Sequence, residues 1–169
     1  CDLPPYDAGL PRFKGRQETM RRFVGMGTFS TSVLVPVDAL VPIDRDIPFA
    51  QAALIGCGVM TGVGAVVNTA QVEPGSSVAI FGCGGVGLNC IQGAVLASAE
   101  PIIAVDIHDN KLEMAKQFGA THTINASCEN PVELILEMSE GLGVHYAFEA
   151  IGLASEPFLQ SIECTRKRG

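Results

Sequence analysis

The feature that most constrains this chain is an apolar strand followed at once by a glycine turn. Residues 78–81 form a short apolar run, which predicts a buried strand, and Gly82, Gly84 and Gly87 follow in a Gly-x-Gly-x-x-Gly pattern. The first glycine of this pattern permits a tight bend, the second lets backbone N–H groups approach a pyrophosphate, and the third lets the next helix lie close to the strand. An uncharged segment of helical length follows at residues 85–98. We therefore expect a dinucleotide to bind at Gly82, Cys83, Gly84, Gly85, Val86 and Gly87, with the Cys83 side chain packed in the interior.

A second apolar strand supports the same interpretation. Residues 102–105 end in Asp106, which lies 19 residues after Gly87. At that distance a carboxylate is placed to accept hydrogen bonds from the hydroxyls of the adenosine ribose. A 2′-phosphate beside Asp106 would be repelled, so the sequence favours NAD over NADP. The alternative is a glycine-rich turn between strand and helix in some other kind of α/β protein.

Composition excludes several other classes of protein. The net charge of −7 argues against a general nucleic-acid surface, and 47% hydrophobic with 17% charged residues argues against disorder. Six cysteines without a Cys-x-x-Cys pair fit reduced thiols or metal ligands in a cytoplasmic protein. Two long uncharged runs, at residues 49–72 and 74–98, raise the possibility of a membrane span. Glycine and polar residues interrupt both runs, so we expect buried α/β core and no membrane.

The order of the expected elements predicts a doubly wound α/β fold. Strands are expected at residues 78–81, 102–105, 122–124 and 144–150, with helices between them and a further helix from about residue 155. Right-handed crossovers would place four such parallel strands in the order 3-2-1-4. A complete domain of this kind has two more strands, so we expect the chain to be a piece of a longer protein.

The residues before this sheet give weaker signals. Residues 1–25 are expected to form a loop, and β-branched residues predict short strands at 27–37 and 39–43. A helix is expected to begin after Pro48 and to be interrupted by the glycines at residues 56–58.

Several stretches together resemble the zinc-containing alcohol dehydrogenases of the medium-chain dehydrogenase/reductase superfamily. They are residues 26–30 (MGTFS), 54–62 (LIGCGVMTG), 81–87 (FGCGGVG), 105–107 (VDI) and 148–152 (FEAIG). The resemblance implies part of a β-rich, GroES-like catalytic domain at residues 1–57. Part of an NAD-binding Rossmann domain, with its first four strands, would follow at residues 58–169.

The resemblance also assigns roles to individual residues. Cys57 corresponds to a ligand of the catalytic zinc, whose other two family ligands would lie before residue 1. Thr61 corresponds to a threonine near the nicotinamide, and Lys111 to a residue that reaches the adenosine ribose. Ile107 and Ile151 correspond to residues that could flank the adenine.

Each of these residues also has a plainer interpretation. Cys57 could be a small buried thiol in a helix, Thr61 a hydroxyl bonded to its own helix backbone, and Lys111 a solvated charge. The two isoleucines could be ordinary core residues. Surface or loop positions are expected for His108, His122 and His145.

The function implied by the resemblance is that of a zinc- and NAD-dependent alcohol or aldehyde oxidoreductase. In the parent protein, zinc would polarise the oxygen of a small-molecule alcohol, and hydride would pass to the nicotinamide. We expect a homo-oligomer, and we expect the isolated 169 residues to be inactive. The alternatives are a zinc-free quinone or enoyl reductase of the same superfamily, and a dinucleotide-binding module without chemistry.

Overall fold

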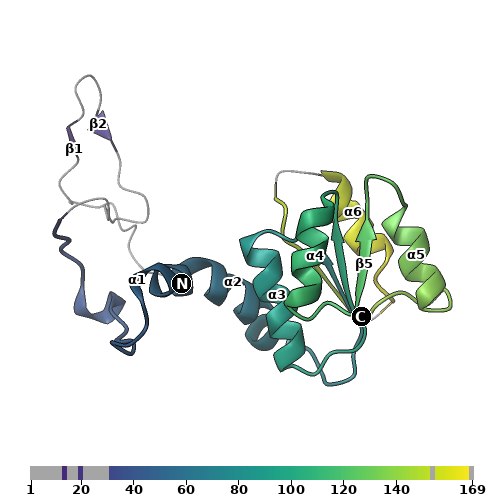
Figure 1. Cartoon of the computed structure of the whole chain (residues 1–169), viewed down its shortest axis with the longest axis horizontal. Helices are drawn as coiled ribbons and strands as arrows, with labels where there is room; N and C mark the ends of the chain where they lie inside the picture. The colour runs from purple at the N-terminus through teal and green to yellow at the C-terminus, as the bar shows by residue number, and fades with distance from the viewer. Residues whose placement is uncertain (1–12, 15–18, 21–30, 153–154, 168–169) are drawn as a thin grey trace. The chain divides into compact units, whose positions relative to one another are not determined.

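The structure is a computed structural model that describes residues 13–14, 19–20, 31–152 and 155–167 (Figure 1). The chain divides into two compact units, Cys1–Ile47 and Pro48–Gly169. The residues predicted to form the functional site all belong to the second unit.

The described part of the first unit contains two very short strands and one helical turn. β1 (Phe13–Lys14) pairs antiparallel with β2 (Thr19–Met20), and η1 (Val37–Ala39) is a 3-10 turn. The loop predicted over residues 1–25 is therefore wrong at this pair, and the rest of it lies outside the described residues.

The two strands predicted between residues 27 and 43 are wrong wherever the structure describes them. No strand forms at residues 31–43, and the motif at residues 26–30 lies outside the described residues. Pro36 and Pro42 fall in this segment and have no N–H group to donate to a ladder. The segment is also almost entirely exposed, so neither packing nor pairing stabilises an extended ladder there.

A long continuous helix opens the second unit. It consists of α1 (Phe49–Leu54), the π-helical turn η2 (Ile55–Val59), α2 (Met60–Gly64) and a second π-helical turn η3 (Ala65–Thr69). The interruption predicted at residues 56–58 is wrong, because the helix absorbs both glycines in the wider π turn and continues. Turns of this kind are frequent at functional sites, and this one contains Cys57.

This helix is much more exposed than predicted. By length and composition alone, the helix Phe49–Thr69 is long and apolar enough to cross a membrane. Its most apolar 18-residue stretch has a mean hydropathy of 1.7, and only 11% of that stretch is buried. The buried core predicted for this run is therefore wrong in this structure, because the helix packs along one face only. The second uncharged run behaves as predicted, since it contains a fully buried strand and a helix with a buried face.

The second unit is built on a parallel four-stranded sheet. The strands are β3 (Val78–Phe81), β4 (Ile102–Asp106), β5 (His122–Asn125) and β6 (Tyr146–Glu149). They lie in the order β5-β4-β3-β6, which confirms the predicted order of 3-2-1-4. Phe81 lies opposite Val105 on one side and Glu149 on the other, so three strands end at the same edge.

Helices cover both faces of the sheet, as a doubly wound fold requires (Figure 1). α3 (Gly85–Leu96) and α4 (Asp109–Gln117) cover one face, where Ile80, Ile91 and Leu112 share a core. α5 (Pro131–Met138) and α6 (Ser155–Glu163) lie on the other face, where Phe81 and Ile135 share a second core. The predicted α/β class is confirmed.

Glycines allow α3 to lie unusually close to its neighbours. A Cβ atom added at Gly87 would lie 1.7 Å from the carbonyl oxygen of Gly82. A Cβ atom at Gly62, in α2, would lie 2.5 Å from Cβ of Asn89 in α3. The glycine of α3 therefore sets the approach of helix to strand, and the glycine of α2 sets the approach of helix to helix.

A histidine joins the sheet to the segment after α6. The Ser77 N–H donates to Nδ1 of His145 at 2.9 Å, and Nη1 of Arg166 lies 2.7 Å from Nε2. Arg166 also donates to the Gly143 carbonyl through Nε and Nη2, at 3.1 and 2.9 Å. Burial and the neighbouring Arg166 charge lower the pKa of His145, and the Glu73 carboxylate opposes them. His145 occupies a bend just before β6, which agrees with the predicted surface or loop position, and its half-buried ring takes part in this network.

The contact between Gly87 and Gly82 predicts the effect of adding a methyl group. Gly87→Ala should lower the free energy of unfolding by about 3 kcal/mol or more, because the clashing atom belongs to rigid backbone. Gly85→Ala is the matched control in the same turn, since a Cβ atom there meets nothing within 4 Å. It should change stability by at most about 1 kcal/mol in urea unfolding. Equal stability of the two variants would contradict the close approach.

The His145 network predicts a dependence of stability on pH. The folded pKa lies below the ordinary value of 6.5, so the unfolded chain takes up a proton first as the pH falls. The contribution of His145 should therefore be present above pH 6.5 and be lost as the solution becomes more acidic. Urea unfolding at pH 7.5 and 5.5 measures how far the free energy of unfolding falls between the two pH values. This decrease should be smaller for His145→Gln than for the wild type. His122→Gln changes an exposed histidine and should show the same decrease as the wild type.

Candidate functional site

A cavity of about 690 Å³ lies at the edge where β3, β4 and β6 end. The chain order of the strands reverses between β3 and β6, and ligands of open α/β sheets bind at such a switch point. The cavity brings together many of the residues predicted to hold a cofactor. Its lining includes Gly82, Gly84, Asp106, Ile107, Lys111 and Ile151.

A second hollow, of about 800 Å³, runs beside β6 and α6 and includes His145, Phe148 and Arg166. It contains none of the predicted site residues. The smaller cavity is therefore the better candidate, since the glycine turn and the carboxylate at the end of β4 meet there.

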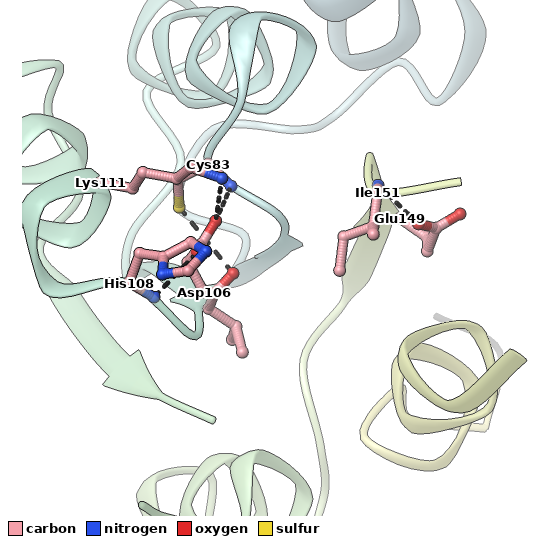
Figure 2. Close-up of polar contacts among 7 residues, drawn as sticks. Cys83, Asp106, His108, Lys111, Glu149 and Ile151 are labelled. Carbon is pink, nitrogen blue, oxygen red and sulfur yellow. Dashed lines mark hydrogen bonds and ion pairs between the residues drawn. The ribbon is translucent and has the colours of Figure 1, made fainter. Parts of the chain in front are cut away.

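Asp106 is the polar centre of the cavity (Figure 2). It is only 7% exposed, although it carries a carboxylate. Its Oδ2 accepts the backbone N–H of Cys83 at 2.8 Å, and its Oδ1 accepts the N–H of His108 at 3.0 Å. The ammonium group of Lys111 lies 3.8 Å from Oδ2. These contacts fix the carboxylate and leave lone pairs on both oxygens for further donors such as ribose hydroxyls.

The Cys83 side chain is buried in the turn, as predicted. It is 2% exposed, and its thiol points toward the carbonyl of Val105 at 3.9 Å. Burial raises the pKa of this thiol to about 12, assisted by the Asp106 charge and opposed by Lys111. A thiol of this kind stays protonated, so Cys83 contributes its backbone to the site and no nucleophile.

The glycine turn leaves backbone open at the start of α3. Added Cβ atoms at Gly84 or Gly85 would meet no other atom within 4 Å. Gly84 occupies the N-cap position and has no side chain to cap the helix. The first N–H groups of α3 and the positive end of its dipole are thus suited to an anion such as a pyrophosphate. Val86 is half-buried and Gly87 is buried, so both pack the turn, while their backbone N–H groups belong to the first turn of α3.

Two isoleucines form apolar walls of the cavity. Ile107 is 57% exposed and Ile151 is 49% exposed, so neither is an ordinary core residue. Ile151 lies against the glycine turn, because its Cγ1 would be 2.6 Å from a Cβ atom added at Gly82. An exposed pair of aliphatic side chains beside a buried carboxylate suits a ring such as adenine joined to a sugar.

Part of the site lies outside the set of residues predicted from the sequence. The cavity is also lined by residues of α6, and the carboxylate of Glu149 accepts N–H groups from the turn that carries Ile151. The acidic residue at the end of β6 was a signal, since a carboxylate followed by a glycine turn often bonds to that turn. The missed residues of α6 are Ser155, Glu156, Pro157 and Gln160.

Cys57 and Thr61 lie apart from the cavity lining. Both are exposed on the long helix, which packs against α3. The exposure of Cys57 contradicts the alternative of a buried helix thiol. Among the described residues no group of three His, Cys, Asp or Glu side chains could hold a metal ion. Cys57 is therefore not grouped with other potential zinc ligands in the described part of the chain. His108 and His122 are exposed, as predicted.

The sequence of this chain is similar to those of known dehydrogenases. A sequence profile described as "Zinc-binding dehydrogenase" matches residues 85–169, which is half of the chain. An S-(hydroxymethyl)glutathione dehydrogenase of Paracoccus denitrificans is 42% identical over 151 residues, which are 86% of this chain and 40% of that protein. Another from Synechocystis sp. is 41% identical over 160 residues, which are 94% of this chain and 43% of that protein.

The fold matches a solved structure of the same kind. The crystal structure of benzyl alcohol dehydrogenase from Acinetobacter calcoaceticus superposes with a TM-score of 0.81 at 38% identity, over 87% of this chain and 40% of that one. The chain therefore spans about 40% of the length of these relatives. The sequence profile matches half of the chain, and the fold matches that of a solved alcohol dehydrogenase. The resemblance to zinc-containing alcohol dehydrogenases is thus confirmed, and the chain belongs to the zinc-binding dehydrogenase family.

Proposed function

We propose that these residues form part of a zinc- and NAD-dependent oxidoreductase that transfers hydride between a small-molecule alcohol or aldehyde and a nicotinamide cofactor. The observation that carries this proposal is the cavity in which the glycine turn, Asp106 and Lys111 meet at the carboxyl edge of the sheet. The proposed layout is part of a catalytic domain at residues 1–57 and part of the NAD-binding domain at residues 58–169.

The residues of the cavity fit NAD. The pyrophosphate would lie over the open backbone of Gly84 and Gly85, and Asp106 would accept hydrogen bonds from the adenosine ribose. Lys111 would add a donor beside the ribose, and Ile107 and Ile151 would enclose the adenine. NAD, when bound, supplies the hydride acceptor, and the role of this chain is to hold it in a fixed orientation.

Zinc has a less complete site in the described residues. We propose Cys57 as one ligand, supported by its exposed thiol and its place in a π-helical turn between two glycines. Bound zinc would supply a Lewis acid, and the remaining ligands would come from outside the described residues. Thr61, one helical turn further on, is proposed to lie near the nicotinamide.

The family favours this function over the two alternatives. A zinc-free quinone or enoyl reductase would have no need for a cysteine at position 57, and the matching profile is that of zinc-binding dehydrogenases. A module without chemistry would not explain the similarity to named dehydrogenases. We also propose a cytoplasmic location, supported by cysteines that are free wherever the structure describes them. A homo-oligomeric full-length protein is part of the same proposal.

The buried carboxylate predicts the choice of cofactor. The full-length protein that carries this chain should use NAD at least about a hundredfold more efficiently than NADP, because Asp106 would repel a 2′-phosphate. Asp106→Asn should narrow that ratio, since it removes the charge and keeps one acceptor for the Cys83 N–H. Steady-state kinetics with both cofactors measure the ratio. Asp109→Asn removes a nearby charge outside the cavity and should leave it unchanged, whereas equal use of both cofactors by the wild type would refute the assignment.

The role of Cys57 predicts a loss of metal. Cys57→Ala in the full-length protein should lower the zinc content by about one ion per chain and abolish turnover, because a catalytic zinc has three protein ligands. NADH binding should survive, since Cys57 lies outside the cavity lining. Cys128→Ala, at another exposed cysteine, is the matched control and should keep both zinc and activity. Full zinc content with normal turnover in Cys57→Ala would favour the zinc-free reductase instead.

A further inference from the structure

We propose that Glu149 is a positioning residue for the dinucleotide, acting through Ile151. Its carboxylate fixes the turn after β6 and thereby holds the Ile151 side chain against the glycine turn. This inference rests on the proposed function, because it names a determinant of affinity at the same cavity. The described lining of the cavity does not include Glu149, so it would touch no ligand itself.

The backbone after β6 depends on the Glu149 side chain. The N–H of Ala150 still donates to the Phe81 carbonyl at 2.8 Å, and the ladder between β6 and β3 ends there. The next N–H group, of Ile151, donates to Oε1 of Glu149 at 2.6 Å (Figure 2). The N–H group of Gly152 donates to the same oxygen at 2.7 Å. One carboxylate oxygen therefore takes over where the sheet stops pairing. Gly152 has a φ of +69°, so the chain turns sharply at this point.

The turn places Ile151 where it can shape the cavity. A Cβ atom at Gly82 would lie 2.6 Å from Cγ1 of Ile151 and 3.2 Å from the carbonyl carbon of Ala150. The first glycine of the phosphate turn thus packs directly against the turn after β6. A shift of Ile151 would open the wall of the cavity beside the glycine turn.

Charge explains why a carboxylate suits this position. An ionised oxygen that accepts two N–H groups makes stronger hydrogen bonds than a neutral acceptor. Without it, both N–H groups would turn to water, because this side chain lies near the surface. The turn would then sample other conformations, and part of the binding free energy of the ligand would be used to order it.

NADH titration followed by fluorescence tests the role of Glu149 in the full-length protein. Glu149→Ala should raise the Kd for NADH about tenfold, because the turn loses its acceptor. Glu149→Gln keeps an oxygen at the same place and should stay within about threefold of the wild type. Glu113→Ala removes a surface glutamate of α4, outside the cavity lining, and should have no effect. If Glu149→Ala fails to fold, Glu149→Asp makes the same test, since its shorter side chain withdraws the oxygen and keeps the charge.

A double-mutant cycle with Ile151→Ala separates positioning from general stability. If Glu149 acts through Ile151, the double variant should bind NADH about as weakly as Ile151→Ala alone. Additive losses, or an unchanged Kd in Glu149→Ala while the wild type binds NADH, would overturn the role of Glu149 and leave the proposed function intact. A wild-type protein that binds no NADH would refute the proposed function, and the role of Glu149 with it.

Discussion

The second unit depends on the contact between Gly87 and the carbonyl oxygen of Gly82. Because no side chain stands between them, α3 begins directly behind the end of β3, and its first turn points into the space at the sheet edge. The same closeness brings the Cys83 N–H within 2.8 Å of the Asp106 carboxylate, which ties the turn to the neighbouring strand. On the other side, Ile151 packs against Gly82 and ties the turn to β6. Three strand ends are thus joined around one cavity by small residues, backbone donors and two carboxylates.

Much of this arrangement was predictable, because it follows from short sequence patterns and from the order of strands and helices along the chain. Gly82, Gly84 and Gly87 have spacing that only a strand–turn–helix unit satisfies well, and Asp106 marks the end of the next strand. Once the four parallel strands are recognised, the handedness of crossovers gives their order, and the cavity must lie where that order reverses. Asp106 therefore meets the glycine turn as its spacing predicted. Ile107, Lys111 and Ile151, to which the family resemblance assigned contacts with the cofactor, line the same cavity.

Other features were not predictable from local patterns. The glycines beside Cys57 suggested a break, but the hydrogen bonding of the helix adapts through a π turn, which depends on packing against α3. The exposure of the same helix could not be read from its composition, because an apolar run shows what a helix can bury and does not show what covers it. The roles of Glu149 and His145 depend on hydrogen bonds to backbone N–H groups that turn geometry alone brings within reach.

We propose above all that the glycine turn binds the pyrophosphate of NAD and that Asp106 binds its adenosine ribose, and a crystal structure of the full-length protein with NADH tests this most directly. We predict pyrophosphate oxygens within hydrogen-bond distance of the backbone N–H groups at the start of α3. We also predict both hydroxyls of the adenosine ribose on the Asp106 carboxylate, with the adenine between Ile107 and Ile151. A dinucleotide bound elsewhere, or one whose ribose makes no contact with Asp106, would contradict the account.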